Sequence, residues 1–288
     1  MTRNHSVGWL AAGFAGVLAS LGSAFAGPLE TAAIPSCSVP PALSDIGVAL
    51  DRSADRIARG SSLTIIAMGS SSTQGVGASA PSMSYPSRLE GELRDRFPGN
   101  QLRVLNRGIG GQDVGEELNR LDRDVVAEHP DLVIWQVGTN AVLRRDDLTA
   151  DEQLIRRGVS LMKESGIDIV LMDMQYARRV LARSAWSTME WVIGEVAQSN
   201  HVGLFRRFEI MQEWDRTQQL SPAAAIGPDG LHMTDASYGC LASQLAEALA
   251  WSWWSHGKIA KSSHQNPHTV SGLSQPAAAT LSAPLRRQ

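Results

Sequence analysis

Leu63-Thr-Ile-Ile-Ala-Met68 is a short and almost uninterrupted apolar run that ends at Gly69. Nearly continuous apolar runs of this length are typical of strands that are covered on both faces of a sheet. Similar runs recur at residues 102–105, 132–137, 167–172 and, more weakly, 202–205. The sequence therefore predicts five buried strands.

Helical patterns lie between and around these runs. They cover residues 42–57, 86–97, 114–128, 151–165 and 182–199, and a last one ends at Trp254. Thr149 and Glu152 predict a capping box in the fourth pattern, and Thr234 is the predicted N-cap of the last helix. The alternation of strands and helices predicts a parallel, doubly wound sheet with right-handed crossovers. The expected fold class is α/β, a flavodoxin-like three-layer α/β/α sandwich with a five-stranded parallel sheet.

The composition is that of a soluble globular protein. The 288 residues carry a formal net charge of -3, and 43% of them are hydrophobic while 19% are charged. This near-neutral balance argues against nucleic acid as a partner, because nucleic-acid binders present a basic face. Two cysteines are too few for a zinc ribbon or a dense disulfide scaffold.

The N-terminus has the features of a secretory signal peptide. Arg3 opens it, an apolar stretch covers residues 7–21, and Ala24-Phe-Ala26 fits the small-x-small rule for cleavage before Gly27. The alternative is a membrane anchor, but the apolar stretch is short and rich in glycine. We therefore expect a periplasmic or secreted protein without a stable membrane span.

The composition changes at both ends of the predicted sheet and gives the domain boundaries. The expected segments are a signal peptide at 1–26, an N-terminal arm and helix at 27–60, a main domain at 61–254 and a disordered tail at 255–288. The tail contains Ser, Pro, Ala and Gln but no acidic residue, which is typical of disorder.

Small polar residues follow each of the first three predicted strands. These loops are Gly69-Ser-Ser-Ser-Thr-Gln-Gly75, Asn106-Arg-Gly-Ile-Gly-Gly111 and Gly138-Thr-Asn140. In a parallel sheet they meet at one edge, where ligands usually bind. Hydroxyls, glycine amides and a carboxamide suit a nucleophile with hydrogen-bond donors for a developing oxyanion. Gln175 and Tyr176 follow the fourth strand at the same edge and are candidate substrate-binding residues.

A serine nucleophile needs a general base, and chain position selects one histidine. Four histidines lie in the predicted signal peptide or tail: His5, His256, His264 and His268. His129 and His201 precede the third and fifth strands, so they lie at the opposite edge. Only His232 follows the sheet on the correct side, and Asp229, three residues upstream, can orient its imidazole. The alternative for Asp229 is a residue of a local turn.

Taken together, these motifs resemble the SGNH (GDSL-type) hydrolase family over about residues 63–254. The first family block, Gly-Asp-Ser-x-x-x-Gly, aligns with residues 69–75 and implies that Ser71 is the nucleophile. There are two departures. Ser70 replaces the usual Asp, which is not a triad member, so we expect activity to survive. Ala141 stands where many relatives have Asp, which puts the substrate class in doubt and not the chemistry.

The remaining family blocks imply an oxyanion hole and a base. Gly111 lies five residues after an Asn, as the second block requires, and Asn140 completes the Gly-x-Asn of the third. The resemblance implies that the Ser71 and Gly111 amides and the Asn140 side chain bind the oxyanion. Asp229 and His232 match the Asp-x-x-His block and complete the implied triad.

The resemblance implies a serine esterase that hydrolyses carboxylic esters through an acyl-enzyme, without cofactor or metal, and the predicted signal peptide implies that it is exported. We favour O-acetyl groups on glycans as the ester, so the expected partner is an acylated glycan or lipid. A lysophospholipase or thioesterase of the same family is the alternative. Two further hypotheses assign the protein to classes other than enzymes. One is a flavodoxin-like phosphate- or flavin-binding module, and the other is an inactive carbohydrate-binding relative. The first leaves the Asp229–His232 pair unexplained, and the second leaves the complete catalytic set unexplained.

Cys37 and Cys240 are the only cysteines. We hypothesise that they form a disulfide, because both remain in the mature chain and the expected compartment is oxidising. Cys37 lies in a Pro-rich arm with little apolar surface, and a covalent bond would hold this arm on the domain. The alternative is a buried Cys240 and a free Cys37 thiol on a mobile arm.

Overall fold

The structure is a computed structural model that describes residues 37–145 and 147–255. The predicted signal peptide, its cleavage site and all of the predicted tail beyond Ser255 lie outside the described residues. Within these residues no helix combines the length and apolar character needed to cross a membrane.

Five parallel strands form one sheet in the order β2-β1-β3-β4-β5. They are β1 (Leu63–Gly69), β2 (Leu102–Gly108), β3 (Leu132–Gln136), β4 (Asp168–Met172) and β5 (Gly203–Phe205). Every residue of the central strand β3 is buried, and all but Thr64 are buried in β1. The continuous apolar runs arise from this two-sided burial, and the predicted five-stranded parallel sheet is confirmed.

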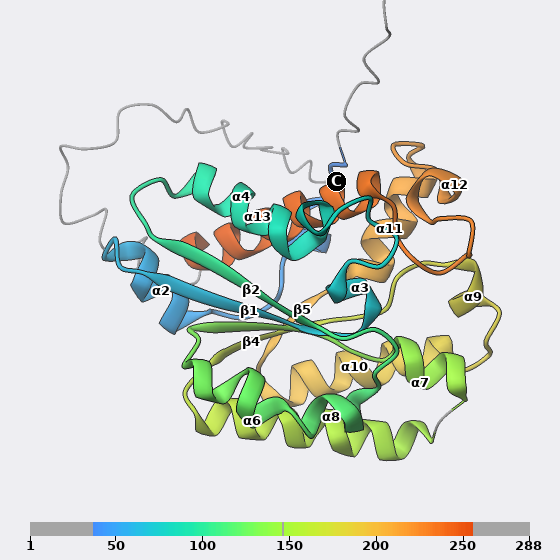
Figure 1. Ribbon diagram of the computed structural model, residues 1–288, viewed down its shortest axis with the longest axis horizontal. Helices are drawn as coiled ribbons and strands as arrows, with labels where there is room; N and C mark the ends of the chain where they lie inside the picture. The colour runs from blue at the N-terminus through green and yellow to red at the C-terminus, as the bar shows by residue number, and fades with distance from the viewer. Residues whose placement is uncertain (1–36, 146, 256–288) are drawn as a thin grey trace, which may run out of the picture. The chain divides into compact units, whose positions relative to one another are not determined.

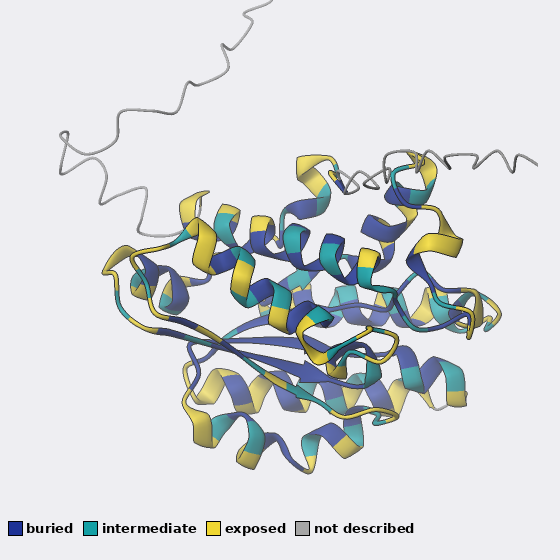
Figure 2. Ribbon diagram, turned by 45° about the horizontal axis from the view of Figure 1, so that its top comes forward, coloured by how far each residue is buried: buried dark blue, intermediate teal, exposed yellow. Residues whose placement is uncertain are grey.

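Helices cover both faces of the sheet (Figure 1). One face carries α4 (Tyr85–Arg96) and α13 (Asp235–Ser255), and the other carries α8 (Leu148–Glu164) and α10 (Trp186–Asn200). Figure 2 shows the central strands and the inward faces of these helices as buried. The three-layer α/β/α architecture is therefore confirmed.

Two predicted helices are broken into shorter pieces. Residues 42–57 form α1 (Pro41–Ser44) and α2 (Asp51–Ala58), separated at Gly47, which has a positive φ of 79°. The pattern at 114–128 is divided into α5 (Val114–Leu118), α6 (Leu121–Asp124) and η2 (Val126–Glu128). Apolar spacing alone does not show such breaks, because short helices can keep a common buried face.

The predicted capping box at Thr149 and Glu152 is wrong. Helix α8 begins at Leu148, two residues before the start that a Thr149 N-cap implies. Its N-cap is Asp147, whose carboxylate accepts a hydrogen bond from the Thr149 amide. The capping box instead opens α5, where Asp113 and Glu116 each bond the backbone amide of the other. Asp is as good an N-cap as Thr, so residue type alone does not locate the helix start.

Several helices without a clear sequence pattern connect the layers. They are α3 (Ser71–Gln74), η1 (Pro81–Met83), α7 (Thr139–Arg144), α9 (Arg178–Leu181), α11 (Arg207–Arg216) and α12 (Pro222–Ala225). In Figure 1, α3, α7 and α9 lie at the same end of the sheet. They follow β1, β3 and β4, so the carboxyl edge of the sheet is the edge that these helices surround.

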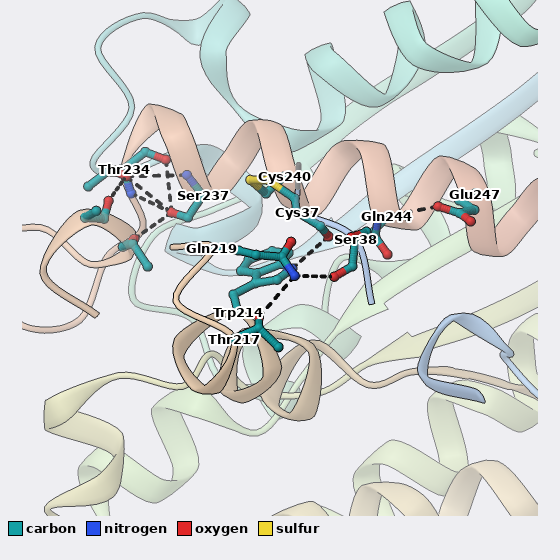
Figure 3. Close-up of a disulfide and its surroundings, with 12 residues drawn as sticks. Cys37, Ser38, Trp214, Thr217, Gln219, Thr234, Ser237, Cys240, Gln244 and Glu247 are labelled. Carbon is teal, nitrogen blue, oxygen red and sulfur yellow. Dashed lines mark hydrogen bonds between the residues drawn. A yellow bond between two sulfur atoms is a disulfide. The ribbon is translucent and has the colours of Figure 1, made fainter. Parts of the chain in front are cut away.

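A disulfide joins Cys37 to Cys240 in α13, with 5.4 Å between their Cα atoms (Figure 3). The Trp214 indole donates to the Cys37 carbonyl at 2.9 Å, and the Gln219 amide donates to the Ser38 carbonyl at 3.0 Å. The structure thus contains the hypothesised bridge, and hydrogen bonds from α11 and the turn after it hold the same arm.

Candidate active site

Ser71 begins helix α3 directly after the tight turn that ends β1. Gly69 has a φ of 155°, and a Cβ added there would collide with Thr73 and Gln136, so this turn requires glycine. Ser70 donates from its amide and its hydroxyl to Gln136 Oε1, both at 3.1 Å. Ser70 therefore anchors the turn on β3, and the Ser71 side chain is left for other partners.

The side chains of Ser71, His232 and Asp229 form a hydrogen-bonded chain. His232 Nε2 lies 2.9 Å from Ser71 Oγ, and His232 Nδ1 lies 2.5 Å from Asp229 Oδ2. Because a carboxylate only accepts, Nδ1 carries a hydrogen and Nε2 accepts the serine proton. Sequence positions 161 residues apart are thus brought into hydrogen-bond contact, in the geometry of a nucleophile, a base and its orienting acid.

Asp229 is held as a carboxylate by the turn in which it lies. Its Oδ1 accepts hydrogen bonds from the Leu231 amide at 2.9 Å and the His232 amide at 3.0 Å. Partial burial raises the pKa of Asp229, but the bonds from Leu231 and His232 outweigh it and hold the pKa below the ordinary value. Asp229 is therefore both a residue of this turn and the hydrogen-bond partner of His232.

The amides of Ser71 and Gly111 are available for a ligand. Neither amide has a hydrogen-bond acceptor among the described residues. The preceding residue, Gly110, donates from its amide to Gln74 Oε1 at 2.8 Å, and a Cβ on it would lie 3.8 Å from Ser71 Cβ. The glycine loop after β2 therefore lies beside the serine, as an oxyanion hole requires.

Asn140 lies at the start of α7, and its position is fixed. Its Nδ2 donates one hydrogen bond to the Gln112 carbonyl at 2.7 Å, which leaves the second N–H for another acceptor. Arg144, one helical turn later, donates to the Gly111 carbonyl at 2.5 Å and forms an ion pair with Asp113. Two contacts from α7 thus hold the glycine loop in place.

Buried Arg120 was not among the site residues predicted from the sequence, although it joins three segments at the carboxyl edge of the sheet. Its guanidinium donates to the Gly69 carbonyl at 3.2 Å, the Arg107 carbonyl at 2.8 Å and Gln112 Oε1 at 2.6 Å. These bonds link the ends of β1 and β2 to the residue that positions Asn140. An arginine in a broken helical pattern gives no sequence signal for this role.

Gln175, a predicted substrate-binding residue, is covered by other parts of the protein. It is fully buried, and its Oε1 accepts hydrogen bonds from Thr139 Oγ1 and from Arg207, both at 3.0 Å. Its Nε2 donates to the Leu231 carbonyl at 3.3 Å. From its buried position, Gln175 therefore links the segment of Asn140 to the loop of His232. The sequence placed it at the correct strand end but did not show that other loops cover it.

Tyr176 is half-buried and lines a cavity beside the His232 loop. Its ring packs edge-to-face on Phe208, with 5.3 Å between the ring centroids. This location is compatible with the predicted substrate contact, which stays a prediction.

A second buried polar group lies beneath Gln175 and was also missed from the sequence. Fully buried Arg207 donates to the Asp173 carbonyl at 2.6 Å as well as to Gln175. The side chains of Asp173 and Glu190 share a hydrogen bond, and burial raises the pKa of both carboxyls. Burial and the nearby Asp173 charge keep Glu190 protonated, so that it donates to Asp173. This group packs behind the site and does not contact the serine.

The two other described histidines lie away from Ser71. His129 and His201 end η2 and α10 in the left-handed conformation, shortly before β3 and β5. They are therefore at the amino edge of the sheet, as chain order predicts. Residues 37–145 and 147–255 contain no group of three His, Cys, Asp or Glu side chains that could hold a metal ion.

A parallel α/β sheet with a Ser–His–Asp chain at its carboxyl edge has the architecture of the α/β serine hydrolases. Residues 36–252 match the non-GDSL lipase-like family, and the chain belongs to this family. Esterases among the relatives support the wider SGNH-like resemblance.

Two curated relatives share short segments with the chain. An arylesterase of Vibrio mimicus is 32% identical over 92 residues, which are 32% of this chain and 45% of that protein. An acetylxylan esterase of Geobacillus stearothermophilus is 38% identical over 64 residues, which are 22% of this chain and 29% of that protein. The chain thus aligns with less than half the length of either relative.

Solved structures show the same fold at low sequence identity. Axe2, an acetylxylan esterase from Geobacillus stearothermophilus, superposes with a TM-score of 0.54 at 22% identity, over 66% of this chain and 95% of that one. A two-domain esterase active on acetylated mannans superposes with a TM-score of 0.58 at 21% identity, over 82% and 59% of the chains. At these identities the comparison establishes the fold alone.

Proposed function

We propose that this protein is a serine esterase that removes O-acetyl groups from glycans through an acyl-enzyme. The observation that carries the proposal is the hydrogen-bonded chain from Ser71 through His232 to Asp229, at 2.9 and 2.5 Å. A phosphate-binding loop would not need this chain, because phosphate is bound by amides and hydroxyls without a base.

The geometry supports a two-step reaction. Ser71 Oγ attacks the ester carbonyl carbon while its proton passes to His232 Nε2, and Asp229 stabilises the imidazolium. The negative oxygen is stabilised by the Ser71 and Gly111 amides and the free N–H of Asn140. The carbon–oxygen bond to the alcohol then breaks, and the imidazolium gives its proton to the leaving oxygen.

Water completes the cycle at the same residues. His232 Nε2 removes a proton from water as the water oxygen attacks the acyl-serine carbonyl. Collapse of the second tetrahedral intermediate breaks the bond to Ser71 Oγ, which takes the proton back from the imidazolium. The products are a carboxylic acid, an alcohol and the regenerated enzyme.

The choice of an acetylated glycan rests on the relatives and on the predicted export. The matched esterases include ones named for acetylxylan and for activity on acetylated mannans. The signal peptide at residues 1–26, the arm and helix at 27–60, the domain at 61–254 and the tail at 255–288 are part of the same proposal. The Cys37–Cys240 bond fits a periplasmic or secreted location, because disulfides persist in oxidising compartments.

The test compares acetyl through palmitoyl esters with acetylated xylan and mannan oligosaccharides. We expect acetyl release from the oligosaccharides, little hydrolysis of long acyl chains, and a loss of several orders of magnitude in Ser71→Ala. Ser72→Ala is the matched control, because Ser72 is the next residue of α3 and is buried. Preference for palmitoyl or thioester substrates would replace the glycan proposal with a lysophospholipase or thioesterase. Full activity in Ser71→Ala would reject the mechanism.

A further inference from the structure

A cavity of about 650 Å³ borders the loop that carries the base. Its lining is mainly apolar and includes Tyr176, Arg178, Leu181, Ile226, Pro228 and Thr234. These residues come from the segment after β4, the region of α12 and the loop before α13. We call this cavity the Arg178 pocket. Nothing in the reaction steps described above uses it.

Part of the wall of the Arg178 pocket is the start of the loop that carries His232. The Gly227 amide, which lies in that wall, donates to the His232 carbonyl at 2.8 Å. The Arg179 amide donates to the Gly230 carbonyl at 3.0 Å, and a Cβ on Gly230 would lie 3.3 Å from Arg178 Nη2. A group bound in the pocket would therefore lie against the loop that positions Asp229 and His232.

Among the residues that the structure describes, Arg178 is the only charged one that lines this pocket. Its side chain is exposed and forms no ion pair with any residue that the structure describes. Some exposed arginines elsewhere are paired, as Arg144 is with Asp113 and Arg216 is with Glu213, while Arg157 forms no ion pair with a described residue. What distinguishes Arg178 is the apolar pocket in which it lies. A guanidinium without an acid partner in an otherwise apolar pocket is complementary to a ligand that has both an apolar face and a negative charge.

We propose that the Arg178 pocket binds a carboxylate carried by the ester substrate, with Arg178 as the specificity-determining residue. This inference rests on the proposed esterase function and narrows its substrate class. Arg178 would form a paired hydrogen bond with the carboxylate, while Tyr176 and Leu181 would contact the apolar face of the same group. The carboxylate can belong to an acidic sugar next to the acetylated one, or to the acyl group of a dicarboxylic half-ester.

Two pairs of matched substrates distinguish these sources. The first pair is an O-acetylated oligosaccharide with a uronic acid and the same compound with its carboxyl reduced to the alcohol. The second pair is 4-nitrophenyl hemisuccinate and 4-nitrophenyl butyrate, which differ in charge on the acyl side. For each pair, kcat/KM is measured in the wild type, Arg178→Gln, Arg178→Lys and the control Arg179→Gln, whose side chain does not line the pocket.

We expect Arg178→Gln to lower kcat/KM about 10- to 100-fold more for the anionic member of one pair than for its neutral partner, the loss typical of a charge-assisted hydrogen bond. Arg178→Lys should recover part of this preference, Arg179→Gln should keep it, and added salt should weaken it. The pair that shows the loss identifies the source of the carboxylate.

Equal losses on the anionic and neutral members of both pairs, or no loss on either, would overturn the role of Arg178. Failure of the proposed esterase function has a different signature. In that case the wild type would hydrolyse none of the four substrates, and a serine-directed phosphonate would not modify it.

Discussion

At the residue scale, hydrogen bonds join Ser71, His232 and Asp229 at the carboxyl edge of the sheet. The elimination of His129 and His201 by strand order agrees with their position at the amino edge of the sheet. Gln175 shows the limit of this reasoning. A polar residue after a strand can face the substrate, or it can be buried under the loops and form hydrogen bonds with them. Only the three-dimensional packing shows which of the two roles a residue has.

Asn140 provides the first prediction at this scale. One N–H of its amide is used by the Gln112 carbonyl, and the other is free to bind the oxyanion. We expect Asn140→Ala to lower kcat about 10²- to 10³-fold with little change in KM, because the oxyanion forms only in the transition state. Steady-state kinetics on an acetyl ester measure both constants. A change confined to KM would show that Asn140 binds the ground state only.

At the element scale, Gln175 connects α7 to the catalytic loop through hydrogen bonds with Thr139 and Leu231. Arg207 donates a further hydrogen bond to Gln175. We expect Gln175→Met to lower kcat about 10- to 100-fold, because small displacements of reacting groups are costly. Gln175→Glu should lower kcat less than Gln175→Met does, because the glutamate keeps an acceptor for Thr139 and Arg207.

Gln244→Met is the matched control for Gln175→Met. Gln244 is also a buried glutamine, but it lies in α13 and contacts Ser44 and Glu247. If both variants lose similar stability and only Gln175→Met loses kcat, Gln175 is a positioning residue. Equal kcat in the two variants would mean that Gln175 has a structural role only.

Glu117 in α5 predicts how stability depends on pH. It accepts a hydrogen bond from Trp135 Nε1 at 2.7 Å, and burial raises its pKa from 4.5 to about 8. The unfolded chain releases this proton near pH 4.5 while the folded chain holds it to about pH 8, so rising pH favours unfolding across that window. Release of one proton on unfolding lowers the free energy of unfolding by about 1.4 kcal/mol for each pH unit in this window.

Glu117→Gln keeps an acceptor for Trp135 but has no proton to release. We expect the free energy of unfolding to fall less between pH 5 and pH 8 in the variant than in the wild type, as measured by chemical denaturation. Asp173 and Glu190 add to the wild-type slope and are unchanged in the variant, so the difference isolates Glu117. Parallel pH profiles would show that Glu117 is ionised in the folded protein.

At the scale of the whole molecule, the sheet could be predicted because strands buried on both faces leave continuous apolar runs such as Leu132–Gln136. The short helices α3, α7 and α9 could not, because a turn of helix after a strand has no periodicity to detect. These helices contain Ser71, Asn140 and Arg178. The sequence therefore predicted that the site residues lie at one edge of the sheet, but not how their side chains are oriented or how far apart they lie.

The Cys37–Cys240 bond is a feature of the same scale. It joins positions 203 residues apart and fixes the start of the described chain on α13, the helix that follows the His232 loop. The sequence indicated the bridge only through the number of cysteines and the expected compartment, since spacing alone does not show which cysteines lie close together.

The central claim is that His232 activates Ser71, and covalent labelling tests it most directly. The protein is treated with a serine-directed fluorophosphonate, and the modified residue is identified by peptide mass spectrometry. We predict one label per chain, on Ser71, in the wild type, and labelling slowed by several orders of magnitude in His232→Ala. Labelling of another serine, or an equal rate of Ser71 labelling in His232→Ala, would contradict the account.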